Sequence, residues 1–240
     1  MSGHSKWNNI KRTKEKSDAE KGKIFTKLVR ELSVIVKTGG SDPNSNSRLR
    51  DIIVKCRQNN VPSDSIARNI KKFSGEGEQV NYEDITYEGY GTGGVAVMVE
   101  CLTDNRNRTA SDVRHAFDKF GGSLGTTGSV SYLFTKQGVI IVDKSGVDYD
   151  TFFELVLLND GYDIEELEDS YVVTTSPDSF SKVLSVIEEN KYTVLSSNVE
   201  YVPASTIELD ESQKATFEKM LALLEDSDDV QEVFHNAILD

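Results

Sequence analysis

The polar segment from Thr103 to Arg108 has the residue types that bind phosphate groups or base edges. It reads Thr-Asp-Asn-Arg-Asn-Arg and lies where a predicted strand runs into the N-terminus of a predicted helix. Free N–H groups at a helix N-terminus bind anions, and Arg and Asn side chains beside them can contact phosphates or bases. A polar turn with an Asn or Thr helix cap explains the same residues equally well. Both interpretations stay open for Asn105, Arg106, Asn107 and Arg108.

Enzymatic chemistry in this segment would need a general base or a metal beside Arg106 and Arg108. Asp104 is the only nearby candidate, and it stands alone. Cys101 and His115 are a second conceivable pair, a nucleophile with its base. Cys101 lies on a predicted strand, however, where a small buried thiol is the ordinary case. We therefore expect a protein that is not an enzyme, with no catalytic residue and no small-molecule substrate.

Metal-ligand spacing is absent from the sequence. The three histidines, at positions 4, 115 and 235, are far apart, and no CxxC or HExxH occurs. The acidic runs 163–169 and 225–229 lack the spacing and the glycine of a calcium loop, so solvated surface is the better interpretation. We expect no metal and no cofactor.

A glycine-rich segment at positions 89–94 formally matches the dinucleotide fingerprint GxGxxG. That fingerprint must open a helix, because the helix N-terminus holds the pyrophosphate. Here the β-branched run Val95–Val99 follows, which predicts a strand. The glycines are therefore interpreted as a turn between two strands.

The charge of the chain is divided very unevenly. Residues 1–75 contain 17 Lys and Arg against 7 Asp and Glu, whereas residues 76–240 contain 10 against 33. The asymmetry predicts an anionic partner for the N-terminal part, a nucleic-acid backbone first and a membrane surface second. The residues expected to contact nucleic acid in this part are Lys6, Trp7, Lys11, Arg12, Lys14, Lys23, Lys27, Arg30, Arg48 and Arg50.

A helix predicted from Ala19 to Lys37 orders part of this charge. Its apolar residues recur at helical spacing, and Lys23, Lys27, Arg30 and Lys37 stack on another side. The same pattern is also typical of a solvated basic face. No apolar run approaches the roughly 18 residues of a membrane helix, and an apolar signal core is lacking. With only two cysteines, a reducing compartment follows, so we expect a cytoplasmic protein without membrane contact.

Hydrophobic periodicity predicts an α+β chain. Three helices come first, at 19–37, at 47–58 and from Pro62-Ser63 onward with Ser63 as N-cap. Strands at 80–90, 95–103 and 129–134 surround a helix at 109–120. Residues 137–200 then read βαββαβ, with the second helix opened by Ser176-Pro177. A helix capped by Asp210 and a strand at 230–234 close the chain.

These elements predict three domains. The fold class is α+β, an N-terminal three-helix domain followed by two ferredoxin-like α/β sandwich domains, the middle one discontinuous. The middle domain has too few helices by itself, so the last helix and strand should complete it. The predicted boundaries are 1–76 for the basic helical domain, 77–135 plus 206–240 for the discontinuous domain, and 136–205 for the inserted domain.

Several segments of the sequence resemble the YebC/PmpR family, and the resemblance covers essentially the whole chain. They are SGHSKWNNIK near the N-terminus, residues 18–23, the loop 39–43, residues 46–50, 60–62 and 87–91, the polar segment 102–109 and residues 128–131. Thr92 and Tyr132 depart from the residues common in the family, Pro and Trp.

The resemblance implies three domains and a non-enzymatic cytoplasmic protein. Members of the family are described as DNA-binding transcriptional regulators, and others, including mitochondrial relatives, as translational activators or ribosome-associated factors. The expected function is therefore a nucleic-acid-binding regulator of gene expression, DNA-binding in the first case. The alternative is a translation factor that binds ribosomal RNA, with the ribosome as partner. No helix-turn-helix is defensible from spacing, which favours backbone contacts over base reading.

Overall fold

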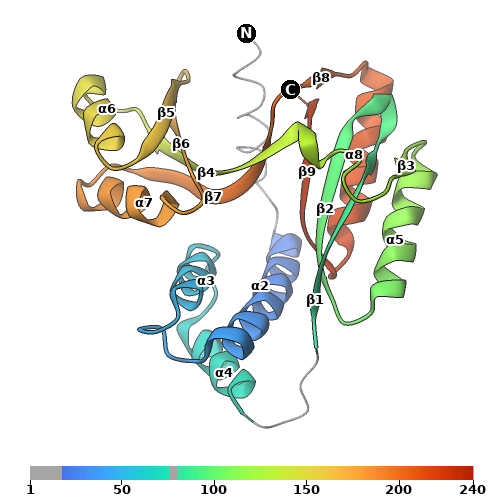
Figure 1. Cartoon of the computed structure of the whole chain (residues 1–240), viewed down its shortest axis with the longest axis horizontal. Coiled ribbons are helices and arrows are strands. Elements are labelled where there is room, and N and C mark those ends of the chain that lie inside the picture. The colour runs from blue at the N-terminus through green and yellow to red at the C-terminus, as the bar shows by residue number, and fades with distance from the viewer. Residues whose placement is uncertain (1–17, 76–80, 240) are drawn as a thin grey trace. The chain divides into compact units, whose positions relative to one another are not determined.

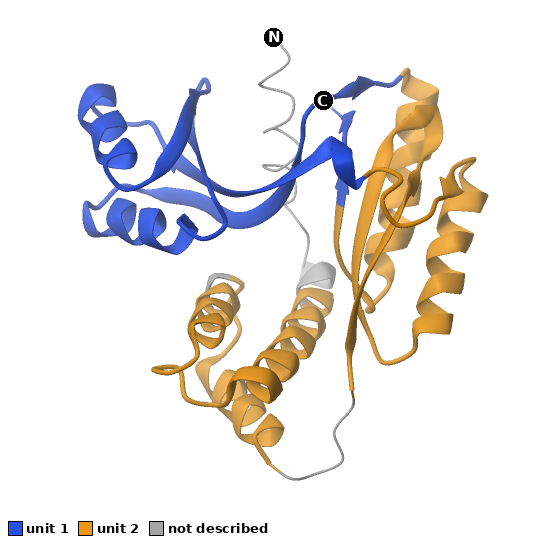
Figure 2. Cartoon of the chain, in the orientation of Figure 1, with its two compact units in different colours: residues 1–14, 131–209, 234–240 blue, residues 15–130, 210–233 orange. Residues whose placement is uncertain are grey.

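The computed structural model describes residues 18–75 and 81–239 (Figure 1). They form two compact units (Figure 2). The described part of unit 1 is 131–209 and 234–239, and that of unit 2 is 18–75, 81–130 and 210–233. The α+β class is confirmed. The three-domain boundaries given above stay a prediction.

Unit 2 begins with three helices: α2 (Asp18–Gly39), α3 (Ser47–Gln58) and α4 (Ser63–Phe73). Their apolar faces meet in one core that includes Leu28, Leu32, Ile35, Val36, Leu49, Ile52, Cys56, Val61 and Ile66. The side chain of Asn46 joins the first two helices, because its oxygen caps α3 at the N–H of Leu49 while its nitrogen donates to the carbonyl of Ile35. The expected Ser63 cap is wrong. Pro62 occupies the cap position without a side-chain bond, and Ser63 is the first helical residue.

The sheet of unit 2 has the order β3-β1-β2-β9. Strands β1 (Glu83–Tyr90) and β2 (Ala96–Thr103) pair antiparallel, with Ile85 opposite Cys101. The other two strands are β3 (Ser123–Leu124) and β9 (Val230–His235). The strand predicted near the C-terminus thus lies beside β2, as expected from the shortage of partners in the middle of the sequence.

Helices α5 (Arg106–Lys119) and α8 (Glu211–Asp226) cover the same face of this sheet (Figure 1). A Cβ atom on Gly89 would lie 2.7 Å from the ring of Phe117 in α5. One on Gly91 would lie 2.9 Å from the ring of Phe217 in α8. Gly89 in β1 and Gly91 just after it therefore lack side chains, so that both helices can approach the sheet. The predicted Asp210 cap of α8 is confirmed, as a capping box with Gln213.

The glycine-rich segment connects β1 to β2. Thr92–Gly94 form a short 3₁₀ turn, and the N–H of Gly91 donates to the carbonyl of Val95 at 2.7 Å. Gly93 and Gly94 have φ of 72° and 79°, the left-handed region that favours glycine. The prediction of a turn is confirmed, because a strand and no helix follows the glycines.

The strand expected at 129–134 is wrong. Residues Ser131–Leu133 form a 3₁₀ turn, and β4 begins at Phe134 in the sheet of unit 1. The segment before it is held by the buried carboxylate of Glu88, which accepts from the N–H groups of Gly128 and Val130 at 2.9 Å each. The side chain of Glu88 therefore accepts the backbone hydrogen bonds that the predicted strand would have made to a neighbouring strand.

Unit 1 contains the expected βαββαβ sequence. Its elements are β4 (Phe134–Asp143), α6 (Tyr149–Leu157), β5 (Gly161–Glu166), β6 (Ser170–Thr175), α7 (Phe180–Glu189) and β7 (Val194–Pro203). The strand order β5-β6-β4-β7, antiparallel throughout, is that of a ferredoxin-like sandwich.

Two local features of unit 1 differ from the sequence prediction. Helix α7 begins at Phe180, because the hydroxyl of Ser176 accepts from the N–H of Ser179 in a turn that contains Pro177. Sequence patterns also missed the short parallel pair β8 (Ile207–Glu208) and β10 (Ala237–Ile238). Among the described helices of both units, none is long and apolar enough to cross a membrane.

Candidate nucleic-acid interface

The basic face of α2 lies against the acidic end of α8 and the turn that follows. Lys23 donates to the carboxylate of Asp226, and Lys27 donates to the backbone carbonyl of Glu225 at 3.2 Å. Arg30 Nη1 lies 2.5 Å from Asp229 Oδ1. The helical spacing of these cations was predicted from the sequence, but their acidic neighbours were not. Their binding to nucleic acid stays a prediction, and it now requires that these neighbours be displaced.

Asp229 is the centre of this contact. Its side chain is 5% exposed, and Oδ2 accepts from Arg108 Nη2 at 2.7 Å and from the Thr109 hydroxyl at 2.8 Å. The hydroxyl of Thr103 lies 3.2 Å from the same oxygen. Burial acts to raise the pKa of Asp229, but the hydrogen bonds from Arg108, Arg30 and Thr109 outweigh it and hold the pKa below its usual value. An ionised carboxylate thus joins α2, the end of β2 and the start of α5.

The Asn and Arg residues of the 103–108 segment divide into two groups. Asn105 is the N-cap of α5 and accepts from the N–H of Arg108 at 3.1 Å. Arg108 pairs with Asp104 at 2.8 Å and with Asp229. Arg106 and Asn107 are exposed, and in the described chain Arg106 makes no ion pair. The cap interpretation therefore holds for Asn105, whereas Arg106 and Asn107 are open to a ligand.

The predicted cations of α3 also differ from one another. Arg48 is exposed at the start of the helix. Arg50 Nη1 donates to the carbonyls of Pro43 and Asn44, at 2.6 and 3.2 Å, and so holds the loop before α3. Arg50 is exposed as well, but it has a structural role that its charge alone did not indicate.

Helix α4 presents a basic ridge, which is Arg68, Lys71 and Lys72. Ile66, Ile70 and Phe73 belong to the helical core or pack against it, and the three cations lie on the opposite side of the helix. All three are exposed, and no described carboxylate lies within ion-pair distance of them. Their helical spacing from the apolar residues indicates that they face outward, but the lack of acidic partners is a tertiary property that a sequence pattern does not carry. They were therefore not among the predicted contacts, nor was the exposed Arg57 of α3.

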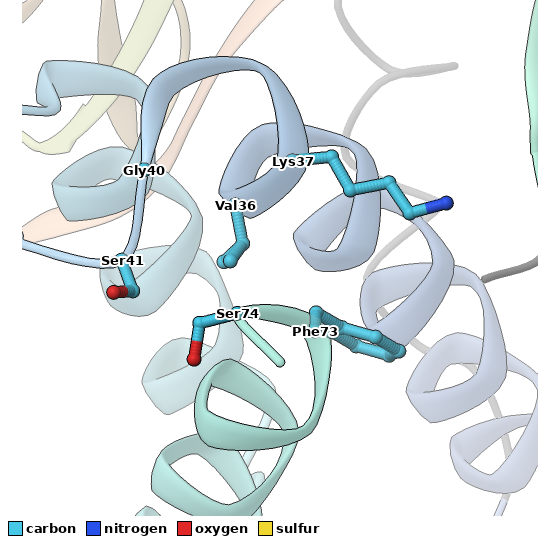
Figure 3. A pocket seen from close by; sticks show the side chains of 6 residues that line it. All are labelled: Val36, Lys37, Gly40, Ser41, Phe73 and Ser74. Carbon is cyan, nitrogen blue, oxygen red and sulfur yellow. The ribbon is translucent and has the colours of Figure 1, made fainter. Parts of the chain in front are cut away.

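A pocket of about 280 Å³ opens where the C-terminal ends of α2 and α4 meet (Figure 3). It is lined by Val36, Lys37, Gly40, Ser41, Phe73 and Ser74. Figure 3 shows the ammonium group of Lys37 directed away from Ser41 and Ser74, and it lies 3.4 Å from Asn81 Oδ1. Its lining side chains include no carboxylate, thiol or imidazole.

The two thiols are buried and weakly acidic. Burial, with the nearby charge of Asp229, raises the pKa of Cys101 to about 12, and burial raises the pKa of Cys56 to about 11. A thiol with such a pKa is protonated at neutral pH and is a poor nucleophile. Over residues 18–75 and 81–239, no three or more potential metal ligands come together. The expected contacts Lys6, Trp7, Lys11, Arg12 and Lys14 lie outside the described residues.

Two family models match the chain over nearly its whole length. The TACO1/YebC protein N-terminal domain matches residues 5–76, and the TACO1/YebC second and third domain matches residues 82–237. The N-terminal match contains α2, α3 and α4, and the other contains both four-stranded sheets.

Known proteins are similar to the chain in sequence and in structure. A "probable transcriptional regulatory protein" of Caldicellulosiruptor saccharolyticus is 49% identical over 237 residues, covering 98% of each chain. One from Acetivibrio thermocellus is 50% identical over 238 residues, again with 98% coverage of each. The crystal structure of a conserved hypothetical protein from Aquifex aeolicus has a TM-score of 0.80 and 40% identity, covering 92% of each chain. By its sequence and its fold, the chain belongs to the TACO1/YebC family.

Proposed function

We propose that this protein is a DNA-binding regulator of transcription that contacts the nucleic-acid backbone through its N-terminal helices. The basic ridge of α4 carries the proposal, because Arg68, Lys71 and Lys72 are exposed cations without acidic partners in the described chain. The names of the relatives, probable transcriptional regulatory proteins, support it. Exposed Lys and Arg on a helix neutralise phosphates and supply sequence-independent affinity.

The acidic remainder of the protein limits where nucleic acid can bind. Residues 76–240 contain 33 Asp and Glu against 10 Lys and Arg, so they repel a polyanion. Contact should therefore be restricted to the helices and to Arg106 and Asn107 at the start of α5. In this proposal the regulator acts without catalysis.

A second candidate function is a translation factor bound to ribosomal RNA. The α4 ridge favours it as much as the first, because the charged groups of Arg68, Lys71 and Lys72 bind the phosphates of either nucleic acid. Such a surface fits the phosphates of structured RNA as well as those of duplex DNA. The nucleic acid that binds more tightly decides between the two functions.

The test is a salt titration of binding to a duplex DNA and to ribosomal RNA. The variant Arg68→Gln/Lys71→Gln/Lys72→Gln should bind both more weakly, with the slope of log affinity against log salt flatter by roughly 0.7–0.9 for each lost contact. The control is Arg114→Gln/Lys119→Gln/Lys191→Gln, which removes three exposed cations elsewhere. Equal affinities and slopes for the two variants would contradict a nucleic-acid interface on α4.

A further inference from the structure

The acidic run Glu225–Asp229 offers α2 the groups that a nucleic-acid backbone would offer. It supplies one carbonyl oxygen and three carboxylates to successive cations of one helix face, with Arg30 Nη2 lying 3.9 Å from Asp228 in addition to the Asp229 contact. The run begins with the last two residues of α8, where the helix dipole adds negative potential, and continues into the turn that follows. This basic face of α2 is therefore already in contact with oxygen atoms of the same chain, three carboxylates and one carbonyl.

The contacts differ in how readily they exchange. The side chains of Lys23 and Asp226 are 41% and 67% exposed, so their ion pair competes with water and salt and is weak. Arg30 and Asp229 are 17% and 5% exposed, and Asp229 has further donors in Arg108 and Thr109. Opening this inner pair would leave a buried charge without its partner, which is strongly unfavourable. The outer part of the contact can open while the inner part stays closed.

We propose that the acidic run is an internal competitor of nucleic acid for α2. Lys23 and Lys27 bind backbone phosphates only when residues 225–228 move away from them, whereas Arg30 stays with Asp229 and joins α2 to the sheet. This inference rests on the proposed function, since it adds a regulation to the same interface. A polyanion with closely spaced phosphates displaces the run, because it releases condensed counterions when it binds. Isolated anions gain nothing comparable, so the contact makes binding selective for dense phosphate backbones.

The experiment neutralises two carboxylates of the competitor without touching the cations, and it leaves the Glu225 carbonyl that contacts Lys27 in place. Asp226→Asn/Asp228→Asn should bind a duplex DNA of about 20 base pairs, or ribosomal RNA, more tightly than the parent protein. At 0.1 M salt the affinity should rise by up to roughly eightfold for each cation that is freed. A phosphate contact with a salt slope of about 0.9 strengthens binding by that factor when the salt concentration falls tenfold to 0.1 M. The salt slope should steepen by about 0.7–0.9 per cation. The control Asp112→Asn/Asp118→Asn makes the same change of net charge on exposed positions of α5.

A second variant shows which cation is released. Lys23→Gln should change affinity little in the parent protein, where Asp226 already neutralises Lys23. In the Asp226→Asn/Asp228→Asn protein it should remove part of the gain, and this difference measures the coupling of the two residues. Thermal unfolding of each variant shows that the fold is retained.

Three outcomes separate the inference from the function on which it rests. Equal affinities of Asp226→Asn/Asp228→Asn and of its α5 control, with binding still lost in the α4 variant, would overturn the competitor and leave the proposed function standing. An equal effect of Lys23→Gln in both backgrounds would overturn the competitor as well. If neither the α4 variant nor Asp226→Asn/Asp228→Asn changes the affinity, the competitor and the proposed function are both overturned.

Discussion

Arg30 Nη1 and Asp229 Oδ1 are 2.5 Å apart although 199 positions separate the two residues in the chain. Arg30 lies on the helix that the sequence identified as basic, and Asp229 lies in a run that the sequence suggested was solvated surface. Asp229 is 5% exposed and binds Arg108 through its other oxygen. One carboxylate therefore joins the N-terminal helices to the polar segment at the start of α5, so two regions that the sequence presented as separate ligand contacts are parts of one network.

Replacing Asp229 should destabilise the protein more than replacing its neighbour. Asp229→Asn leaves Arg30 and Arg108 without their shared anion, and breaking a buried pair from one side typically costs about 3–5 kcal/mol. Arg108 is 46% exposed and is partly solvated after the change, so a loss near or below the lower end of that range is expected. Urea unfolding of the full chain measures it.

The matched control for that measurement is Asp228→Asn. Asp228 is 54% exposed and lies 3.9 Å from Arg30, so its replacement should change the free energy of unfolding by less than about 1 kcal/mol. Equal effects of the two substitutions would mean that the Asp229 network does not hold this part of the fold together.

The thiols of the folded protein should react slowly. Burial raises the pKa of Cys56 to about 11 and that of Cys101 to about 12, so the thiolate is a very small fraction at pH 8. A colorimetric disulfide reagent should therefore label both cysteines within minutes in denaturant and far more slowly under native conditions. Rapid native labelling of Cys101, measured in the variant Cys56→Ala, would revive its interpretation as a nucleophile.

Acid should destabilise the fold through His235. Burial lowers the pKa of His235 to about 4, whereas the unfolded chain binds this proton near pH 6.5. Between these values the unfolded state holds more protons, so stability is fully present above pH 6.5 and falls as the pH drops toward 4. The slope contributed by one proton is about 1.4 kcal/mol per pH unit at most.

The comparison of the parent protein with His235→Gln isolates this contribution. Denaturant unfolding at several pH values between 4 and 7 should give a flatter dependence for the variant, while carboxylates contribute alike to both proteins. Parallel curves would show that His235 titrates normally in the folded state. His115, which is exposed, supplies the control substitution His115→Gln.

Local signals in the sequence predicted elements well and tertiary partners poorly. Helix α3 begins and ends where the pattern placed it, at 47 and 58, and Asp210 caps α8 as predicted. These features depend on residues within one helical turn. The strand expected at 129–134 was wrong because Glu88, about 40 positions away, bonds that backbone.

The candidate site shows the same division between local and distant information. Helical spacing correctly placed Lys23, Lys27 and Arg30 on one face of α2, but it carries no information on the acidic run that faces them. The alternatives for the 103–108 segment could be separated only by the structure, since Asn105 as a cap and Asn105 as a ligand have the same sequence. Charge is visible in a sequence, whereas its neutralisation by distant residues is not.

Arg106 and Arg108 provide a test of that separation within three residues of chain. Arg108 bonds Asp104 and Asp229, so Arg108→Gln should lower the free energy of unfolding, while its effect on nucleic-acid binding should follow only from that loss. Arg106 is exposed and has no ion pair in the described chain, so Arg106→Gln should leave unfolding within about 0.5 kcal/mol of the parent protein. If Arg106 contacts a phosphate, the same substitution should flatten the salt slope of binding by about 0.7–0.9 for DNA and RNA alike.

Urea unfolding and salt titration on the same two proteins give the comparison. Lower stability in Arg106→Gln, or a flatter salt slope in Arg108→Gln at unchanged stability, would contradict the assignment of Arg108 to the fold and Arg106 to the ligand.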